Sequence, residues 1–403
     1  LEELSFDANA KLQLKELDIS TLVKLKKITI NGYVPNTFND NYSYPLSSIV
    51  LPKTETLTYL SFQKHDIKTL NFKDVPNLTY INLNGGSFEN IDLTNSSKVQ
   101  QLVVRNNSFD TIDISAIQNI AQFYITGNPL GCIKVSQNQL DSAKTNWDKP
   151  PNAIYALDCS RTYVPDDYFE EILIYFGYDS GQLDDYVYTE KIKDVTELKS
   201  AYPGGGLKHI KDPTGIEDFT NLTFLNWAWV KINSLDLSAL TKLERVDVTS
   251  YEATNFVDSA PTLSSIILPE TETLKIVGLD RNALTSIDVS KLPNLEYLYL
   301  MNNKIKSLDL TSNTNLVSLS IPVYEVNNDG DYWEKIESLD VSGLTKITNL
   351  QLNYHNLKSL DVSEITALRI LYTVGNPNLS CIKVSQDQLN KVSTQTHWAK
   401  DSD

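Results

Sequence analysis

The chain has 403 residues, of which 41% are hydrophobic, and it carries a formal net charge of −16 at pH 7. This apolar content is sufficient for a packed core, while no apolar run is long enough for a membrane span. Acidic residues are spread along the whole sequence, which argues against nucleic acid or an anionic membrane surface as the main partner.

Apolar residues recur with a fixed period from the start of the chain. Leu60, Ile81, Leu102 and Phe123 follow one another at intervals of 21 residues, and the positions around them read L-x-x-L-x-L-x-x-N-x-L. A period in this range with this apolar frame is typical of leucine-rich repeats, in which each repeat adds one coil to a solenoid. The sequence therefore predicts a mainly β leucine-rich repeat solenoid, with a curved parallel sheet on its concave face and few helices.

The first array is predicted over residues 1–160. Leu1 already falls on a frame position, so we expect the chain to begin inside an array, without an N-terminal cap. After Cys132 the frame is lost, and residues 135–147 are predicted to form a short amphipathic helix that belongs to a C-terminal cap. Cys132 and Cys159 bracket this cap, which favours a disulfide between them; a pair of reduced structural thiols is the alternative.

Residues 161–221 lack the period and are predicted to form the N-terminal cap of a second array. Asp166 or Asp167 is the expected N-cap of a helix that stops at Gly177. The apolar positions of this helix fall at i, i+3, i+4 and i+7, which predicts a buried face made of Phe169, Ile172, Leu173 and Phe176.

The second array, residues 222–403, repeats the first closely enough to indicate a duplication. Asp309 corresponds to Asp92 at an offset of 217 residues, and the ending GNPLGCIKVSQNQL recurs as GNPNLSCIKVSQDQL. Cys381 takes the position of Cys132, and its partner is expected beyond Asp403, so the second C-terminal cap is predicted to be truncated. A segment over residues 322–335 interrupts the second array and has no counterpart in the first.

In these motifs, and in SLDLS at Ser234, SIDVS at Ser286, SLDVS at Ser338 and Ser359, and YVPDDYFEEILIYFGYDSGQLDDYV at Tyr163, the chain resembles the leucine-rich repeat surface proteins of Bacteroidota and, loosely, internalins. The resemblance covers nearly the whole chain. It implies an exported protein, attached to the outer cell surface or secreted, that binds other molecules and has no activity of its own. His65, Trp227 and Val230 depart from the pattern, because they stand where small, Asn-like residues are usual.

Candidate catalytic and metal-binding residues have a structural explanation. Eight aspartates recur in the D-(L/V/I)-(S/T) step of successive coils, and an aspartate that every coil carries is expected to satisfy backbone N–H groups at a bend. The four histidines follow no zinc-binding spacing. We therefore expect no catalytic residues, no metal and no cofactor.

The candidate ligand-binding residues are the variable ones beside the frame. In each strand they should point outward from the concave face while the frame residues point inward. Ile276, Tyr297, Tyr299 and Met301 form the main cluster on two neighbouring coils; exposed tyrosine is suited to protein contacts, although cross-strand pairing that only stiffens the sheet is the alternative. The further candidates on this face and on the rim insertion over residues 322–335 are Phe224, Tyr372, Tyr59, Tyr80, Tyr124, Tyr324, Tyr332 and Trp333.

These features predict a non-enzymatic recognition or adhesion protein that binds a protein ligand through its concave faces and rim insertions. The resemblance implies that this ligand is a protein of a host or of a neighbouring cell. One alternative is glycan binding, with Tyr297, Tyr299 and Tyr372 stacked on sugar rings. Another is that the chain is the binding module of a larger enzyme whose catalytic domain lies outside it. Neither a nucleic acid partner nor a membrane-spanning segment is expected.

Overall fold

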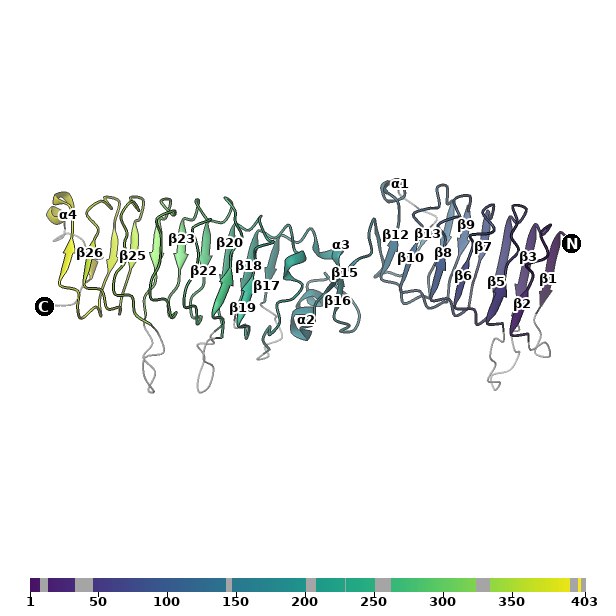
Figure 1. Ribbon diagram of the computed structural model, residues 1–403, viewed down its shortest axis with the longest axis horizontal. Coiled ribbons are helices and arrows are strands. Elements are labelled where there is room, and N and C mark those ends of the chain that lie inside the picture. The colour runs from purple at the N-terminus through teal and green to yellow at the C-terminus, as the bar shows by residue number, and fades with distance from the viewer. Residues whose placement is uncertain are drawn as a thin grey trace. The chain divides into compact units, whose positions relative to one another are not determined.

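The structure is a computed structural model in which the chain forms two compact units, Leu1–Ser160 and Arg161–Asp403. It describes residues 1–7, 14–32, 46–142, 147–200, 208–228, 230–250, 262–323, 334–391 and 398–399. Each unit is a row of coils whose strands lie side by side and parallel (Figure 1). The predicted leucine-rich repeat solenoid is therefore confirmed.

In the first unit, one side of the coils carries a long parallel sheet, which corresponds to the predicted concave face. Its strands, in spatial order, are β1 (Glu3–Asp7), β3 (Lys27–Asn31), β5 (Tyr59–Gln63), β7 (Tyr80–Asn82), β9 (Gln101–Val103), β11 (Gln122–Tyr124) and β13 (Trp147–Asp148). The opposite side carries the pairs β2 (Glu16–Asp18) with β4 (Ser48–Val50) and β6 (Thr69–Asn71) with β8 (Asn90–Asp92), and the triplet β10 (Thr111–Asp113), β12 (Cys132–Lys134) and β14 (Ile154–Ala156).

The second unit begins with a cap and continues as a longer solenoid. The cap contains β15 (Arg161–Tyr163), α2 (Asp167–Tyr175), β16 (Tyr186–Tyr188), α3 (Thr189–Ile192) and a 3-10 turn over Ile216–Asp218. The long sheet runs in the order β17 (Glu197–Lys199), β18 (Phe224–Trp227), β20 (Arg245–Val248), β22 (Ile276–Gly278), β23 (Tyr297–Tyr299), β24 (Ser318–Ser320), β25 (Asn349–Gln351), β27 (Ile370–Tyr372) and β29 (Trp398–Ala399). On the other side, β19 (Ser234–Asp236) pairs with β21 (Ser265–Ile267), and β26 (Ser359–Asp361) pairs with β28 (Cys381–Lys383), after which comes α4 (Gln386–Lys391).

Burial along the strands follows the predicted alternation. In β7, Ile81 is fully buried, whereas Tyr80 and Asn82 on either side of it are half-buried on the outer surface of the sheet. Two outward positions differ from the prediction, since Ser61 and Ser318 are buried. Both side chains are short and lie between larger ones on the adjacent strands, Ser61 between Thr29 and Asn82 and Ser318 between Tyr297 and Asn349.

The recurring aspartates hold the bends between the faces, as predicted. Each of the eight accepts the backbone N–H of the residue two positions later; they are Asp18, Asp92, Asp113, Asp236, Asp288, Asp309, Asp340 and Asp361. Asp92, for example, accepts the N–H of Thr94 at 3.0 Å and its hydroxyl at 2.6 Å. These bonds favour the ionised carboxylate and keep the pKa of Asp92 below its usual value.

A ladder of buried asparagines joins consecutive coils on the other flank of the long sheet. Asn128 donates to the carbonyls of Val104 and Ile125 at 2.9 and 2.6 Å. Its Oδ1 accepts the N–H groups of Asn107 and Phe109, both at 3.2 Å. The same slot holds Asn282, Asn303 and Asn376 in the second unit, where each donates to two carbonyls in the same way.

Histidine replaces asparagine in this slot once in each unit. His65 and His355 are buried, and the Nδ1 atom of each accepts a backbone N–H, from Ile67 at 3.1 Å and Ile336 at 3.2 Å. The Nε2 of His355 faces the carbonyl oxygen of Ile321 at 2.7 Å, which fixes the neutral tautomer with the proton on Nε2. Burial lowers the pKa of both imidazoles to about 4.

We expect the first unit to lose stability in mild acid through His65, and the variant His65→Asn to lose less. The folded-state pKa of about 4 lies below the ordinary 6.5, so the unfolded chain binds more protons between these values. Protonation of His65 therefore leaves the free energy of unfolding unchanged above pH 6.5. As the pH decreases to 4, it lowers this free energy by about 3 kcal/mol at most. Urea unfolding followed by hydrogen exchange in β5, β7 and β9 measures this, and parallel pH curves for the two proteins would contradict it.

The predicted disulfide closes the C-terminal cap of the first unit, but the helix of this cap is shorter than predicted. Helix α1 covers only Gln137–Asp141, and Trp147 belongs to strand β13 rather than to the helix. Ser136 is its N-cap and Gln139 completes a capping box; the side-chain amide of Gln139 also donates to two backbone carbonyls of the preceding coil. The predicted disulfide between Cys132 and Cys159 is present, whereas Cys381 is exposed and free.

The cap helix of the second unit also differs from the prediction at one position. Asp166 is the N-cap of α2, and Gly177 has the left-handed conformation (φ 78°) that ends the helix. Phe169, Ile172 and Leu173 are buried, but Phe176 is exposed. The helix ends at Tyr175, so Phe176 lies beyond the last turn and no longer points along the buried face.

Candidate functional site

The strand register of the second unit arranges its variable side chains in two rows across the long sheet. The first row is Glu197, Phe224, Arg245, Ile276, Tyr297, Ser318, Asn349 and Ile370. The second row is Lys199, Asn226, Asp247, Gly278, Tyr299, Ser320, Gln351 and Tyr372. Residues that lie far apart in the sequence are thereby direct neighbours on one surface.

Ile276, Tyr297, Tyr299 and Met301, the predicted main cluster, lie together on this surface and are called the tyrosine patch below. All four are half-buried. The two tyrosine rings stand 6.4 Å apart at an interplanar angle of 31°. Because Tyr299 is flanked by Gly278 and Ser320, and Tyr297 has Ser318 on one side, small residues border both rings.

Two aspartates stand beside the tyrosine patch. The carboxylate of Asp247 lies directly over Gly278, where an added Cβ would be 2.4 Å from its Oδ1, and its other oxygen pairs with Nε of Arg245 at 2.5 Å. Asp280 accepts the N–H of Met301 at 2.7 Å. Burial raises the pKa of Asp280 to about 6, so above that pH its ionised form costs the folded state free energy.

Several other aromatic residues of the long sheets are covered by neighbours from the same chain. Tyr59 stacks on Tyr80 with ring centroids 4.3 Å apart and nearly parallel, and Lys27 lies over Tyr59 at 5.0 Å. In the same unit, Arg105 lies over the ring of Tyr124 at 4.7 Å. Phe224 has Lys199 and Arg245 over its ring, each at 5.3 Å. Among the described residues, no such cation lies over Tyr297 or Tyr299.

Not all of the predicted binding residues come together. Tyr372 shares a row with Tyr299 but is three strands away, roughly 14 Å at the usual strand spacing. Phe224 is separated from Ile276 by the strand that carries Arg245. The candidates Tyr324, Tyr332 and Trp333 lie outside the described residues.

Gly278, Asp247 and Asp280 lie beside the tyrosine patch and were not named as binding candidates, although the frame predicts that Asp247 and Asp280 face outward. Gly278 carries the relevant signal, because a glycine inside a strand marks a place where another group approaches the backbone closely. The alignment of the coils places it beside Tyr299. The half-burial of Asp280 has no comparable sequence signal, since it depends on how the neighbouring side chains pack.

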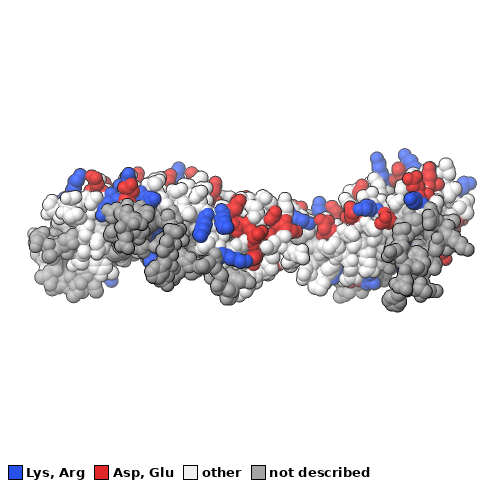
Figure 2. All heavy atoms as spheres, turned by 90° about the horizontal axis from the view of Figure 1, so that it is seen from below, with Lys and Arg blue, Asp and Glu red and all other residues white. Residues whose placement is uncertain are grey.

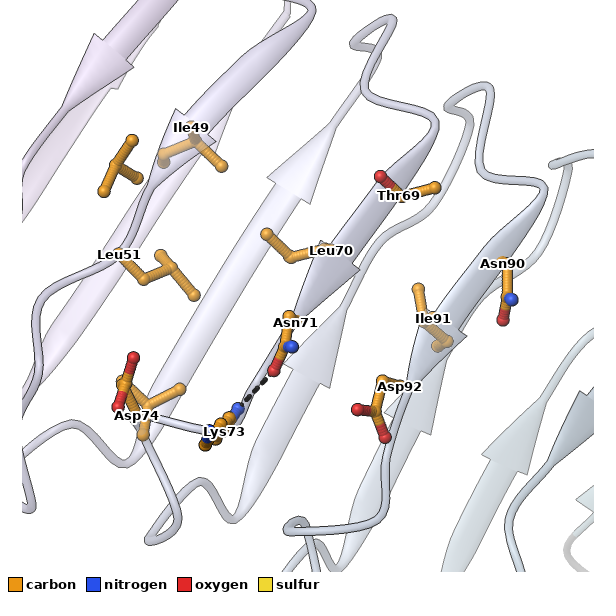
Figure 3. A pocket seen from close by; sticks show the side chains of 12 residues that line it. Ile49, Leu51, Thr69, Leu70, Asn71, Lys73, Asp74, Asn90, Ile91 and Asp92 are labelled. Atoms are coloured by element: carbon orange, nitrogen blue, oxygen red, sulfur yellow. Dashed lines mark hydrogen bonds between the residues drawn. The ribbon is translucent and has the colours of Figure 1, made fainter.

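A groove of about 460 Å³ lies on the opposite side of the first unit, between β4 and β6, which are not paired with each other (Figure 3). Ile49, Leu70 and Ile91 supply apolar lining. Two of its polar residues already serve the fold: Asn71 accepts the N–H of Lys73 at 2.7 Å, and Asp92 holds the turn at Thr94. We therefore place the candidate site on the tyrosine patch rather than in this groove.

No protein-family model matches the chain, and no curated protein matches its sequence. Among solved structures, it is similar to the functional domain of InlJ from Listeria monocytogenes, with 23% identity over 81% of this chain and 64% of that one, at a TM-score of 0.33. It is also similar to a leucine-rich repeat protein of Leptospira interrogans, with 18% identity, coverage of 100% and 93%, and a TM-score of 0.32. For YopM from Yersinia enterocolitica WA-314 the values are 18%, 100% and 80%, and 0.35.

At identities below 25%, these similarities concern the fold alone. The leucine-rich repeat assignment rests on the period and the coils of this chain. None of the helices in the described part of the chain combines the length and the apolar character that a bilayer crossing requires.

Proposed function

We propose that the chain is a non-enzymatic recognition or adhesion protein that binds a protein ligand through the long sheet of its second unit, with the tyrosine patch at the centre of the contact. The observation that carries this proposal is the contrast between its aromatic residues. Tyr59, Tyr124 and Phe224 are covered by cations of the chain itself, whereas Tyr297 and Tyr299 are bordered by small residues. Large, rigid tyrosine side chains over which the described part of the chain places no cation are suited to anchor a protein interface.

Asp280 supports the same proposal. An ionised, half-buried carboxylate beside the patch lowers the stability of the free protein above pH 6. Residues that cost stability without helping the fold tend to occur where function requires them. Its carboxylate would gain a hydrogen-bond donor from the ligand on binding. An exported location, at the cell surface or in the medium, is part of the proposal, as is the contribution of the rim insertion over residues 322–335.

Replacing Tyr297 and Tyr299 together by serine is expected to weaken ligand binding roughly tenfold to a hundredfold, because two central anchors are lost. The ligand would first be isolated by pull-down from serum or cell-surface extract with the whole chain. Surface plasmon resonance with the purified ligand then gives the ratio of dissociation constants. The thermal stability of the variant should stay close to that of the wild type, since both rings stand on the outside of the sheet.

The pair Tyr59→Ser with Tyr80→Ser is the matched control. These two rings are stacked across neighbouring strands, so their loss should lower the stability of the first unit by about 1 kcal/mol and leave ligand binding unchanged. Unchanged binding with a large loss of stability in the Tyr297 and Tyr299 variant would contradict the proposal. A glycan-array signal that disappears in the same variant would replace the protein ligand by a sugar.

A further inference from the structure

The cap of the second unit has an outer surface that its structural role does not explain. Helix α2 closes the end of the solenoid with its inner face: Phe169 packs edge-on against Trp227 at 5.2 Å and stacks with Phe219 at 6.0 Å. The buried residues of α2 are thus used to cover the core. The large apolar residues on the outside of the cap take no part in this.

These outer residues are Tyr163, Tyr175, Phe176, Leu183 and Tyr186, and together they are called the cap surface. Each is between 41% and 48% exposed, which is unusual for side chains of this size. Tyr163 and Tyr186 face each other across the antiparallel strands β15 and β16, with ring centroids 5.2 Å apart. Tyr175 and Phe176 stand at the end of α2 with ring centroids 5.1 Å apart.

Buried carboxylates hold the parts of the cap surface in fixed positions. Glu170 of α2 is fully buried and accepts the N–H groups of Asp184 and Asp185 at 2.9 and 3.1 Å, which ties the start of β16 to the helix. Asp166 accepts the N–H groups of Phe169 and Lys211 at 2.8 and 2.7 Å. A surface that is already ordered pays less conformational entropy when a partner binds.

The charge of the cap indicates the chemistry of that partner. Residues 161–221 contain 13 acidic and 6 basic residues, a net charge of −7 out of −16 for the whole chain. Acidic side chains gather on one face in the stretch that holds α2 (Figure 2). Three of these basic residues are already paired within the same range, Lys193 with Glu190, Lys199 with Glu197 and Lys208 with Glu171.

Aromatic rings in an acidic field favour cationic side chains, because the ring faces and the carboxylates attract the same charge. The cap itself contains an example, since the guanidinium of Arg161 lies over the ring of Tyr188 at 5.2 Å. We propose that the cap surface docks an extended, arginine- and lysine-rich segment of a protein partner. This interaction is separate from the tyrosine patch and does not depend on it.

The test uses the whole chain and a fluorescein-labelled dodecapeptide of alternating arginine and glycine, with a glutamate–glycine peptide as its counterpart. Fluorescence anisotropy should show binding of the arginine peptide, and not of the glutamate peptide. Replacing Tyr163 and Tyr186 together by serine should weaken arginine-peptide binding about tenfold. Replacing Tyr175 and Phe176 by serine provides an independent variant at the other end of the cap surface.

Tyr354 is the matched control, because it is also an exposed tyrosine of the second unit and lies outside the cap. Tyr354→Ser and the Tyr297 and Tyr299 double variant should both bind the arginine peptide like the wild type. Circular dichroism shows whether both cap variants are folded. If the folded variants also bind the arginine peptide like the wild type, only the general negative charge of the chain attracts the peptide. That result, or equal binding of the glutamate peptide, would overturn the proposal.

Discussion

Asn128→Ala is expected to lower the free energy of unfolding of the first unit by about 4 kcal/mol, the largest effect that we predict for a single side chain. The substitution removes two bonds from Nδ2 to carbonyls and two bonds to Oδ1 from the N–H groups of Asn107 and Phe109. The side chain is buried, so the N–H and C=O groups left behind cannot recover these bonds from bulk water. Each buried polar group without a partner costs about 1 to 3 kcal/mol.

Urea unfolding of the whole chain, with hydrogen exchange in β9 and β11 to assign the effect to the first unit, measures this loss. Asn95→Ala is the control, because Asn95 is an exposed asparagine of the same unit whose side chain, within the described part of the chain, bonds only to the neighbouring Thr94. It should change the stability by less than about 0.5 kcal/mol. A similar small change for Asn128→Ala would mean that water or neighbouring groups replace the ladder.

The coils follow from the sequence because their specification is local and repeated. Every coil places its apolar residues at the same frame positions. A departure from the frame at one position therefore leaves the period recognisable in the neighbouring coils. The ladder slot tolerates exchange for the same reason. His65 still accepts a backbone N–H there, and Val230 fills it in the coil nearest the cap, where the side chain is fully buried.

The cap of the second unit was less predictable because it occurs once and depends on contacts between distant segments. Strands β15 and β16 have three residues each, too few for a pattern of alternation, and they pair across 22 intervening residues. The exposure of Phe176 depends on the helix ending at Tyr175. Glu170 is buried inside a helix only because two backbone N–H groups of another segment reach it.

The candidate site likewise has one part that the repeat predicts and one part that depends on contacts between side chains. The frame predicts which residues face outward and which strands are neighbours, so the tyrosine patch could be predicted. It does not predict which rings the chain covers itself, because that depends on the rotamers of long side chains such as Lys27 and Arg245. The difference between Tyr59 and Tyr299 therefore becomes visible only in the structure.

The two C-terminal caps differ in one covalent bond, which leads to the second large effect. Breaking the disulfide between Cys132 and Cys159 by Cys159→Ser is expected to lower the free energy of unfolding of the first unit by about 3 to 4 kcal/mol. The bond closes a loop with a sequence separation of 27 residues, and its loss lets the unfolded chain explore more conformations. Burial of Cys132 adds to the effect, since the bond ties the end of the cap to a strand inside the core region.

Cys381→Ser is the matched control, because this cysteine has the same place in the duplicated cap but is exposed and free. It should leave the stability of the second unit within about 0.5 kcal/mol of the wild type. Hydrogen exchange read separately in β10 to β14 and in β26 to β28 assigns each effect to its own unit. The loss should appear first in β14. This strand lies inside the loop that the disulfide closes, and among the described strands it pairs only with β12. If β14 keeps its protection in Cys159→Ser, the strand pairing alone holds the cap, and the disulfide contributes little to the folded state of the first unit.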